Sequence, residues 1–258
     1  MSKSLRWILP LLAGGVAVAL WAFAALIMQD PTQLPGPLSV GKALGQISGD
    51  MLPLIGVDVG AMVTGFIAAF VLGIATAVAL TTYRGLYLAL TPWVAIGRMT
   101  PLLVLTPIFI VAPLTHFATL VIVTTLICYV PIVAILTPAL IATDKVLLDL
   151  FRTYRASYWQ EICLLRFPYA LPHLMRALRR SAILAPLATL LTDFLEGALA
   201  GQPGLGQLLA DYHDAGNLPA IYALCLGAAL TGVALAGAVD ACAAWVLAHW
   251  HDNEHGHH

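Results

Sequence analysis

Long runs of apolar residues dominate the chain and set its predicted architecture. A helix needs roughly 20 residues to cross a hydrocarbon core of about 30 Å. Five runs reach about that length with few or no charged residues, and each predicts a membrane span. The five predicted spans are 7–28, 59–80, 117–136, 182–200 and 219–250.

A sixth apolar segment, 85–114, is interrupted, because it holds Arg98 and four prolines. Proline removes a backbone donor and bends a helix. The segment therefore predicts a short interfacial helix followed by a kinked span over about 100–114. The total of about six spans indicates an all-α membrane protein.

Composition supports the same class, since 60% of the residues are hydrophobic and 10% are charged. A soluble domain is typically about 45–50% apolar and about 25% charged. Neither a low-complexity linker nor an internal repeat divides the chain. We therefore expect a single transmembrane domain over 1–258.

The basic residues fix the expected orientation. Six spans place both termini on one side of the membrane, and cytoplasmic loops carry the excess of Lys and Arg. With the predicted spans, eleven of the twelve basic residues fall on the side of the termini, and only Lys42 falls on the other. This count predicts a multi-pass protein of the bacterial inner membrane with cytoplasmic N- and C-termini.

One polar interval, 144–181, holds seven of the twelve Lys and Arg residues. Within it, apolar residues recur three or four positions apart, so one side of a helix, or of two short helices, is apolar. Such a segment is too polar to span and should lie in the cytoplasm. Its residues alone leave two alternatives equally open: a helix resting on lipid headgroups or a helix docked in a groove of a partner protein. The apolar positions are Leu147, Phe151, Tyr154, Tyr158, Ile162 and Leu165.

Motif searches exclude several chemistries. The sequence has no G-x-x-x-x-G-K-[ST] phosphate loop, so we expect no ATP to be bound by this chain. It also has no H-E-x-x-H or G-x-S-x-G motif, so we expect no catalytic residue. The tail over about 250–258 carries several of the five histidines of "HWHDNEHGHH", and we expect it to be disordered. No metal site is predicted, because the tail has no fixed ligand geometry.

Ionisable residues inside spans are candidates for function by default. Asp193 and Glu196 lie three positions apart and share a helix face, which makes them candidates for lining a pathway or gate; contacts between helices are the alternative. We expect Asp240 to contact the basic cytoplasmic segment, and Asp58 to lie at the outer start of its span, where a helix N-terminus favours an acid. Arg98 is expected to extend its side chain to the interface.

Several motifs together resemble a known family. "DLFRTYRAS" from Asp149, "YWQ" from Tyr158 and "LLRFPYALPHLMRALRRS" from Leu164 resemble the EAA segment of permease subunits of ABC importers. They are most similar to the nitrate, sulfonate and taurine branch. "LPGPLSV" from Leu34, "GRMTPLLVLTPIFI" from Gly97 and "LEGALAGQPGLGQLL" from Leu195 resemble other parts of the same family.

This resemblance implies that about 144–172 is a coupling segment that binds a cytoplasmic ATPase, with Phe151, Tyr154 and Tyr158 as its apolar anchor. Phe151 and Arg155 stand where the family usually has Ala and Gly, and Asp149 stands where it has Glu. Pro101 joins Asp193 and Glu196 as a pathway or gate candidate. The coupling residues implied are Asp149, Phe151, Arg152, Tyr154, Arg155, Ala156, Ser157, Tyr158, Trp159, Gln160, Pro168 and Pro172.

The resemblance further implies a type I ABC importer permease. It would work with a second permease copy, most simply an identical one, two ATPase copies that carry ATP and Mg²⁺, and an extracytoplasmic binding protein. The cargo would be a small anion, a sulfonate or a vitamin precursor. Two alternatives are a secondary transporter with Asp193 and Glu196 as an ion relay, and a membrane scaffold that recruits a cytoplasmic partner.

Overall fold

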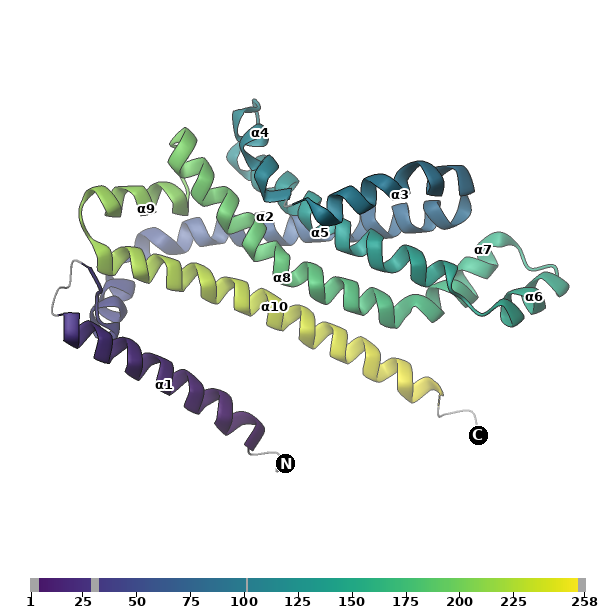
Figure 1. Ribbon diagram of the computed structural model, residues 1–258, viewed down its shortest axis with the longest axis horizontal. Coiled ribbons are helices and arrows are strands. Elements are labelled where there is room, and N and C mark those ends of the chain that lie inside the picture. Colours follow the sequence, from purple (N-terminus) through teal and green to yellow (C-terminus); the bar gives the residue numbers. More distant parts are fainter. Residues whose placement is uncertain (1–4, 29–32, 101, 255–258) are drawn as a thin grey trace.

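A computed structural model describes residues 5–28, 33–100 and 102–254, and every regular element within these ranges is a helix (Figure 1). The first half of the chain forms α1 Leu5–Met28, α2 Pro37–Thr82, α3 Arg84–Met99, the 3₁₀ turn η1 Leu102–Leu105, α4 Thr106–Val111 and α5 His116–Ile141. The second half forms α6 Lys145–Thr153, α7 Tyr158–Glu161, the π-helical turn η2 Ile162–Arg166, α8 Phe167–Ala200, α9 Leu205–Asp214 and α10 Leu218–Glu254.

The described residues contain four helices long and apolar enough to cross a membrane. They correspond to four of the predicted spans, and the predicted all-α architecture is confirmed for the described residues. The first predicted span lies within α1, whose portion Leu12–Met28 is a shorter apolar helix. The four long helices are Pro37–Thr82, His116–Ile141, Tyr158–Ala200 and Leu218–Cys242.

The second predicted span is only part of a longer helix. α2 has 46 residues, roughly 69 Å at 1.5 Å per residue, so it extends well beyond the hydrocarbon core. The predicted placement of Asp58 at a helix N-terminus is therefore wrong, because α2 begins at Pro37. Asp58 instead lies within α2, with 2% of its surface exposed.

The proline-rich segment breaks more sharply than predicted. α3 and the η1–α4 pair are bent by 93° relative to each other, so the kinked span expected over about 100–114 is only two short helical turns. Pro101, a gate candidate, lies outside the described residues. At the other end of the chain, α10 continues to Glu254, into the tail that was predicted to be disordered.

The centre of the fold is formed by α5, which packs along both α2 and α8. One buried cluster joins all three helices through Met62, Cys128 and Ala185. Polar contacts add to it: the Thr124 and Thr189 hydroxyls are 2.7 Å apart, and Ser181 donates to the Cys128 carbonyl at 2.9 Å. Hydrogen bonds of this kind stabilise helix pairs in lipid, where no water competes for them.

The close approach of α2 to α5 depends on a missing side chain at Gly73. A Cβ atom there would lie 2.6 Å from Ile132 Cγ2 and 2.9 Å from its Cβ. Small residues at such crossings let helices pack closely in a membrane, where the hydrophobic effect does not drive helices together. Gly73 is therefore one of the positions that set the distance between α2 and α5; Gly65, where a Cβ would lie 2.8 Å from Thr124 Cβ, is another.

Gly73→Ala should destabilise the protein by about 1–3 kcal/mol, the usual cost of overpacking a core, and lower its Tm in detergent. Gly49→Ala is the matched control on the same helix, because a Cβ at Gly49 meets nothing within 4 Å. It should leave Tm unchanged or raise it slightly, since Ala favours helix over Gly. Equal Tm values for the two variants would contradict this role of Gly73.

Candidate functional site

The polar interval folds into two short helices joined by a turn, one of the two arrangements predicted for it. Asp144 caps α6 by accepting a hydrogen bond from Val146 N at 2.9 Å. Ser157 and Gln160 form a capping box at the start of α7, in which Ser157 N donates to Gln160 Oε1 at 2.7 Å. The Ser and Gln of the recognised motif thus have a local structural purpose: they start α7 immediately after the turn.

Arg155 lies in this turn with a φ of 53°. This left-handed conformation costs about 1–2 kcal/mol for a residue with a Cβ, whereas glycine adopts it freely. The resembling family usually has Gly here. The turn itself therefore gives a sufficient reason for that glycine, without any close approach of a partner's backbone.

Two contacts fasten the interval to the membrane helices. Arg166 forms a largely buried ion pair with Glu161, in which Arg166 Nε donates to Glu161 Oε1 at 2.6 Å, and Arg166 Nη1 donates to the Leu140 carbonyl at the end of α5 at 3.0 Å. The Tyr158 and Thr82 hydroxyls are 2.9 Å apart, which joins α7 to the end of α2. Glu161 and Arg166 were not singled out from the sequence, and charged pairs five positions apart give little signal there.

The predicted apolar stripe is divided between two surroundings. Ile162 is buried and Phe151 is half-buried, while Tyr154 is 80% exposed. The exposed apolar face consists of Val146, Leu150 and Tyr154, which recur every four residues along α6 and its end. Of the predicted anchor residues, Tyr154 is thus the one whose ring is free to meet a partner.

The other predicted coupling residues lie on α6, in the turn, on α7 and at the start of α8. Asp149 and Arg152 form an exposed ion pair at 3.6 Å, and Trp159 is 66% exposed. Ala156 is half-buried in the turn; Pro168 and Pro172 are half-buried in the first turns of α8.

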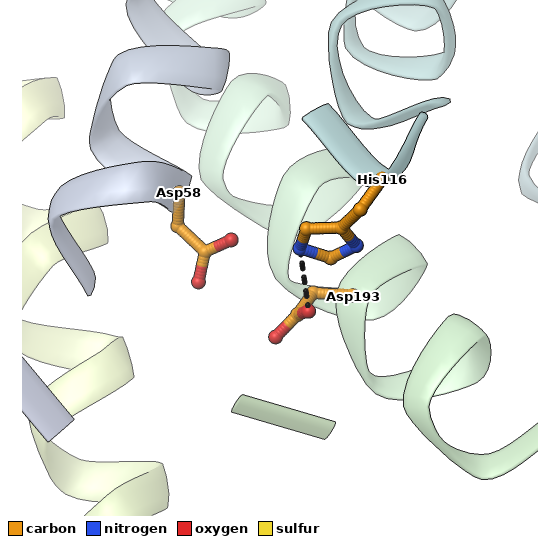
Figure 2. A group of neighbouring side chains, drawn as sticks. All are labelled: Asp58, His116 and Asp193. Carbon is orange, nitrogen blue, oxygen red and sulfur yellow. Dashed lines mark ion pairs between the residues drawn. The ribbon is translucent and has the colours of Figure 1, made fainter. Parts of the chain in front are cut away.

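At the opposite end of the molecule, three buried carboxylates surround one histidine. His116, the first residue of α5, is positioned by Thr115, whose hydroxyl accepts from Ala118 N and caps that helix. Its Nε2 lies 3.4 Å from Asp193 Oδ1 and its Nδ1 lies 2.9 Å from Glu196 Oε2. Figure 2 shows Asp58 of α2 facing the same imidazole from the other side.

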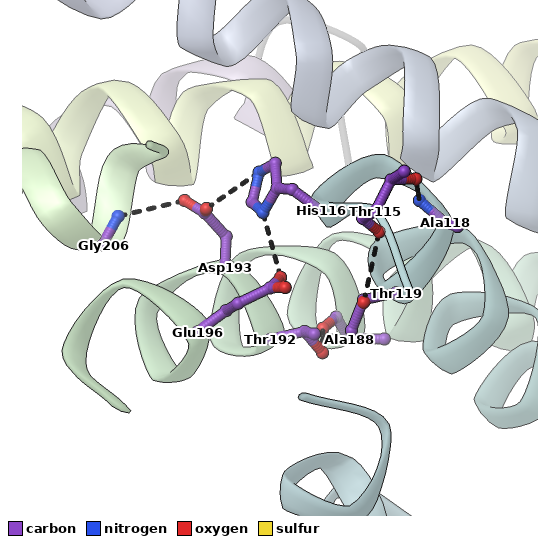
Figure 3. A network of polar contacts seen from close by, with 9 residues as sticks. All are labelled: Thr115, His116, Ala118, Thr119, Ala188, Thr192, Asp193, Glu196 and Gly206. Atoms are coloured by element: carbon purple, nitrogen blue, oxygen red, sulfur yellow. Dashed lines mark hydrogen bonds and ion pairs between the residues drawn. The ribbon is translucent and has the colours of Figure 1, made fainter. Parts of the chain in front are cut away.

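The start of α9 contacts this cluster (Figure 3). Gly206 N donates to Asp193 Oδ2 at 3.1 Å. A Cβ at Gly206 would lie 2.4 Å from the Asp193 carbonyl oxygen, and one at Gly204 would lie 2.0 Å from Asp193 Oδ1. The glycines of the sequence "GLG" are therefore required for this close approach, and Asp193 and Glu196 make contacts between helices.

A separate cavity of about 360 Å³ lies among α3, η1, α5 and α8. Its wall is mostly apolar and includes two positive side chains, Arg98 and Arg180. Asp193 and Glu196 are not among its lining residues. The predicted contact of Asp240 with the basic segment is confirmed, because Arg179 Nε lies 3.0 Å from Asp240 Oδ1.

Comparison with known proteins identifies the family. The model of the binding-protein-dependent transport system inner membrane component family matches residues 65–250, well over half of the chain. The chain belongs to this family. It is a transport permease, and the matched range includes the polar interval 144–181, Asp193 and Glu196.

Relatives of the permease agree with this assignment. A protein of Haemophilus influenzae described as a probable ABC transporter permease protein is 23% identical over 206 residues, which are 80% of this chain and 82% of the relative. Two structures of the methionine ABC transporter MetNI in inward-facing conformations contain chains with the same fold. Their TM-scores are 0.60 and 0.62 at 20% identity, over 76% and 78% of the permease and 95% and 98% of those chains. The prediction of an ABC importer permease is thus confirmed at the level of the family. These comparisons do not assign the chain to the narrower nitrate, sulfonate and taurine branch.

The buried ion pair of the polar interval, Arg166 with Glu161, should contribute far more to stability than the exposed pair, Arg152 with Asp149. Arg166→Gln leaves Glu161 buried without its cation, which should cost roughly 3–5 kcal/mol. Arg152→Gln removes the exposed pair with Asp149, worth about 0–1 kcal/mol. Thermal unfolding of both purified variants measures the difference, and equal losses of Tm would refute the assigned role of Arg166.

Proposed function

We propose that the permease is the membrane subunit of an ATP-driven importer and that α6 and α7 are its contact with a cytoplasmic ATPase. The exposed face of Val146, Leu150 and Tyr154 carries this proposal. An apolar face with anchors one helical turn apart is the pattern of a helix that binds in a groove. Asp149 beside it favours a protein groove over anionic lipid, which would repel this acid.

The attachments of this face explain how a partner's movement would reach the membrane. Tyr158 holds α7 to the end of α2, and Arg166 holds the following turn to the end of α5. A rigid displacement of α6 and α7 would therefore move α2 and α5 with them. Rigid-body movement of packed elements is a common way for proteins to switch between two states. Two ATPases closing on ATP, acting on two permease copies, would supply that displacement.

The proposed orientation follows from the same face. α6 and α7 lie at one end of the molecule and α9 lies at the other (Figure 1). Cytoplasmic α6 and α7 place α9 and the His116 cluster on the outer side, where an extracytoplasmic binding protein would deliver the solute. The basic residues Arg152, Arg155 and Arg166 at the α6–α7 end agree with the excess of positive charge on cytoplasmic segments.

The cavity supports a small anion as the solute. Its volume of about 360 Å³ is within the roughly 300–1,000 Å³ typical of small-molecule sites. Arg98 and Arg180 supply positive charge on a wall whose other residues are apolar apart from Thr100. Guanidinium groups bind carboxylate, phosphate and related anions through paired hydrogen bonds. The carboxylates of Asp193 and Glu196, which would repel an anion, lie outside this cavity.

Tyr154→Ala should weaken binding of the cognate ATPase about thirtyfold, since loss of a buried aromatic anchor commonly costs about 2 kcal/mol. Titration of the ATPase onto the permease in nanodiscs measures this, and uptake in proteoliposomes should fall with it. Tyr154→Phe keeps the ring and should bind as the wild type does. Full ATPase binding and uptake by Tyr154→Ala would mean that α6 rests on lipid instead.

Arg180→Gln should reduce uptake of the transported anion by about 10–100-fold, because a hydrogen bond to a charged group is worth about 1.5–3 kcal/mol. The assay is uptake of nitrate, sulfate and alkane sulfonates by proteoliposomes that contain the ATPase and binding protein. Arg176→Gln, one turn away on α8 and outside the cavity lining, should transport normally. Unchanged uptake of every transported anion by Arg180→Gln would exclude this cavity as the anion's route.

A further inference from the structure

The His116 cluster holds more negative charge than its hydrogen bonds balance. Asp58, Asp193 and Glu196 are 2%, 0% and 3% exposed, and they surround a single imidazole (Figures 2 and 3). A buried carboxylate is costly unless it is paired or coordinates a metal. A protonated His116 would balance only one of three ionised acids, so the cluster reaches neutrality either by binding protons or by binding a cation.

The hydrogen bonds orient the ring in a particular way. Glu196 accepts from His116 Nδ1 at 2.9 Å, which leaves the lone pair of Nε2 directed toward Asp193. The distance from Nε2 to Asp193 Oδ1 is 3.4 Å, longer than a good hydrogen bond. This distance is close to the separation of about 3.3 Å between two ligand atoms of a tetrahedral zinc ion whose bonds are about 2.0–2.1 Å long.

Two oxygen atoms in the cluster have no hydrogen-bond partner among the residues that the structure describes. They are Asp58 Oδ2 and Asp193 Oδ1, and both belong to side chains that are more than nine-tenths buried. One ligand atom from each of Asp58, His116 and Asp193 lies within 4.8 Å of the other two. Buried acceptors without partners, gathered beside one imidazole nitrogen, are a donor set that suits a bound cation.

We propose that Asp58, His116 and Asp193 bind a divalent transition-metal ion such as Zn²⁺. Three ligands from one imidazole and two carboxylates leave a fourth position for water. Glu196 then orients the ligating imidazole through Nδ1, and Gly206 N holds the ligating carboxylate of Asp193 through Oδ2. Such outer partners usually accompany ligating His and Asp residues. The sequence predicted no metal site, and the site proposed here is distinct from the tail histidines.

The ion would have a structural consequence. Its ligands come from α2, α5 and α8, and the Gly206 contact adds the start of α9. These elements are far apart in the sequence, so a bound ion would fasten the end of the molecule opposite α6 and α7. A ligand that binds only the folded state stabilises a protein by an amount that rises with the logarithm of the ligand concentration, so the ion should raise the Tm.

The test measures zinc bound per chain by the full-length protein in nanodiscs, at buffered micromolar free Zn²⁺, by mass spectrometry of the metal. Every arm carries substitutions that remove the tail ligands: His249→Ser, His251→Ser, His255→Ser, His257→Ser and His258→Ser. We expect one Zn²⁺ per chain and a zinc-dependent rise in Tm. Asp58→Asn and His116→Gln should lose both effects.

Two further variants complete the comparison. Glu196→Gln keeps all three ligands and should weaken zinc binding about 10–100-fold, the usual effect of removing a ligand's partner. His213→Gln changes an exposed histidine on α9 outside the cluster and should bind zinc normally.

Absence of saturable zinc binding by the parent protein would overturn the proposal, whatever the variants do. Binding that survives in a folded Asp58→Asn variant at the parent affinity would overturn it as well. A zinc-independent rise in Tm of Asp58→Asn, with no response of the parent to zinc, would show that the cluster holds a proton in place of a metal.

Discussion

The close packing of α2 against α5 is the constraint on which the rest of the structure depends. It requires that no side chain project from Gly73 toward Ile132, because lipid tails are as apolar as the helix surfaces and only close contact favours association. α8 completes the group through buried hydroxyl contacts, Thr124 with Thr189 and Ser181 with the Cys128 carbonyl. The three helices together form a rigid unit that carries a different polar site at each end.

These two ends serve different purposes. At one end, Tyr158 and Arg166 fasten the α6–α7 segment to the last turns of α2 and α5. At the other, Asp58, His116 and Asp193 approach one another from α2, α5 and α8. The same helices therefore run from the proposed ATPase contact to the carboxylate cluster, and the arginine cavity lies beside them. A movement at either end would be carried along helices whose close packing allows discrete rearrangements more readily than gradual deformation.

Much of the fold could be predicted because membrane insertion is governed by local apolar content. The runs at 117–136 and 182–200 appear as α5 and the second half of α8. The ends of helices outside the hydrocarbon core have no such signal. The prediction therefore missed the first 22 residues of α2 and misplaced Asp58. The motif residues Ser157 and Gln160 were recognised by resemblance, and their spacing of three is also the signature of a capping box. The left-handed conformation of Arg155 depends on a backbone angle that residue spacing does not encode.

The sequence by itself determined the class of the protein, its apolar helices, the polar segment between α5 and α8, and the shared face of Asp193 and Glu196. Each of these depends on residues close together in the chain, whose spacing on a helix is fixed by its 3.6-residue period. Only the tertiary structure decided that Asp58 and His116 join Asp193, that Glu161 pairs with Arg166 against the Leu140 carbonyl, and that Arg98 and Arg180 share one cavity. These groupings depend on how far each helix is rotated and shifted against its neighbours. That is set by small-residue contacts such as Gly73 with Ile132, between positions distant in the sequence.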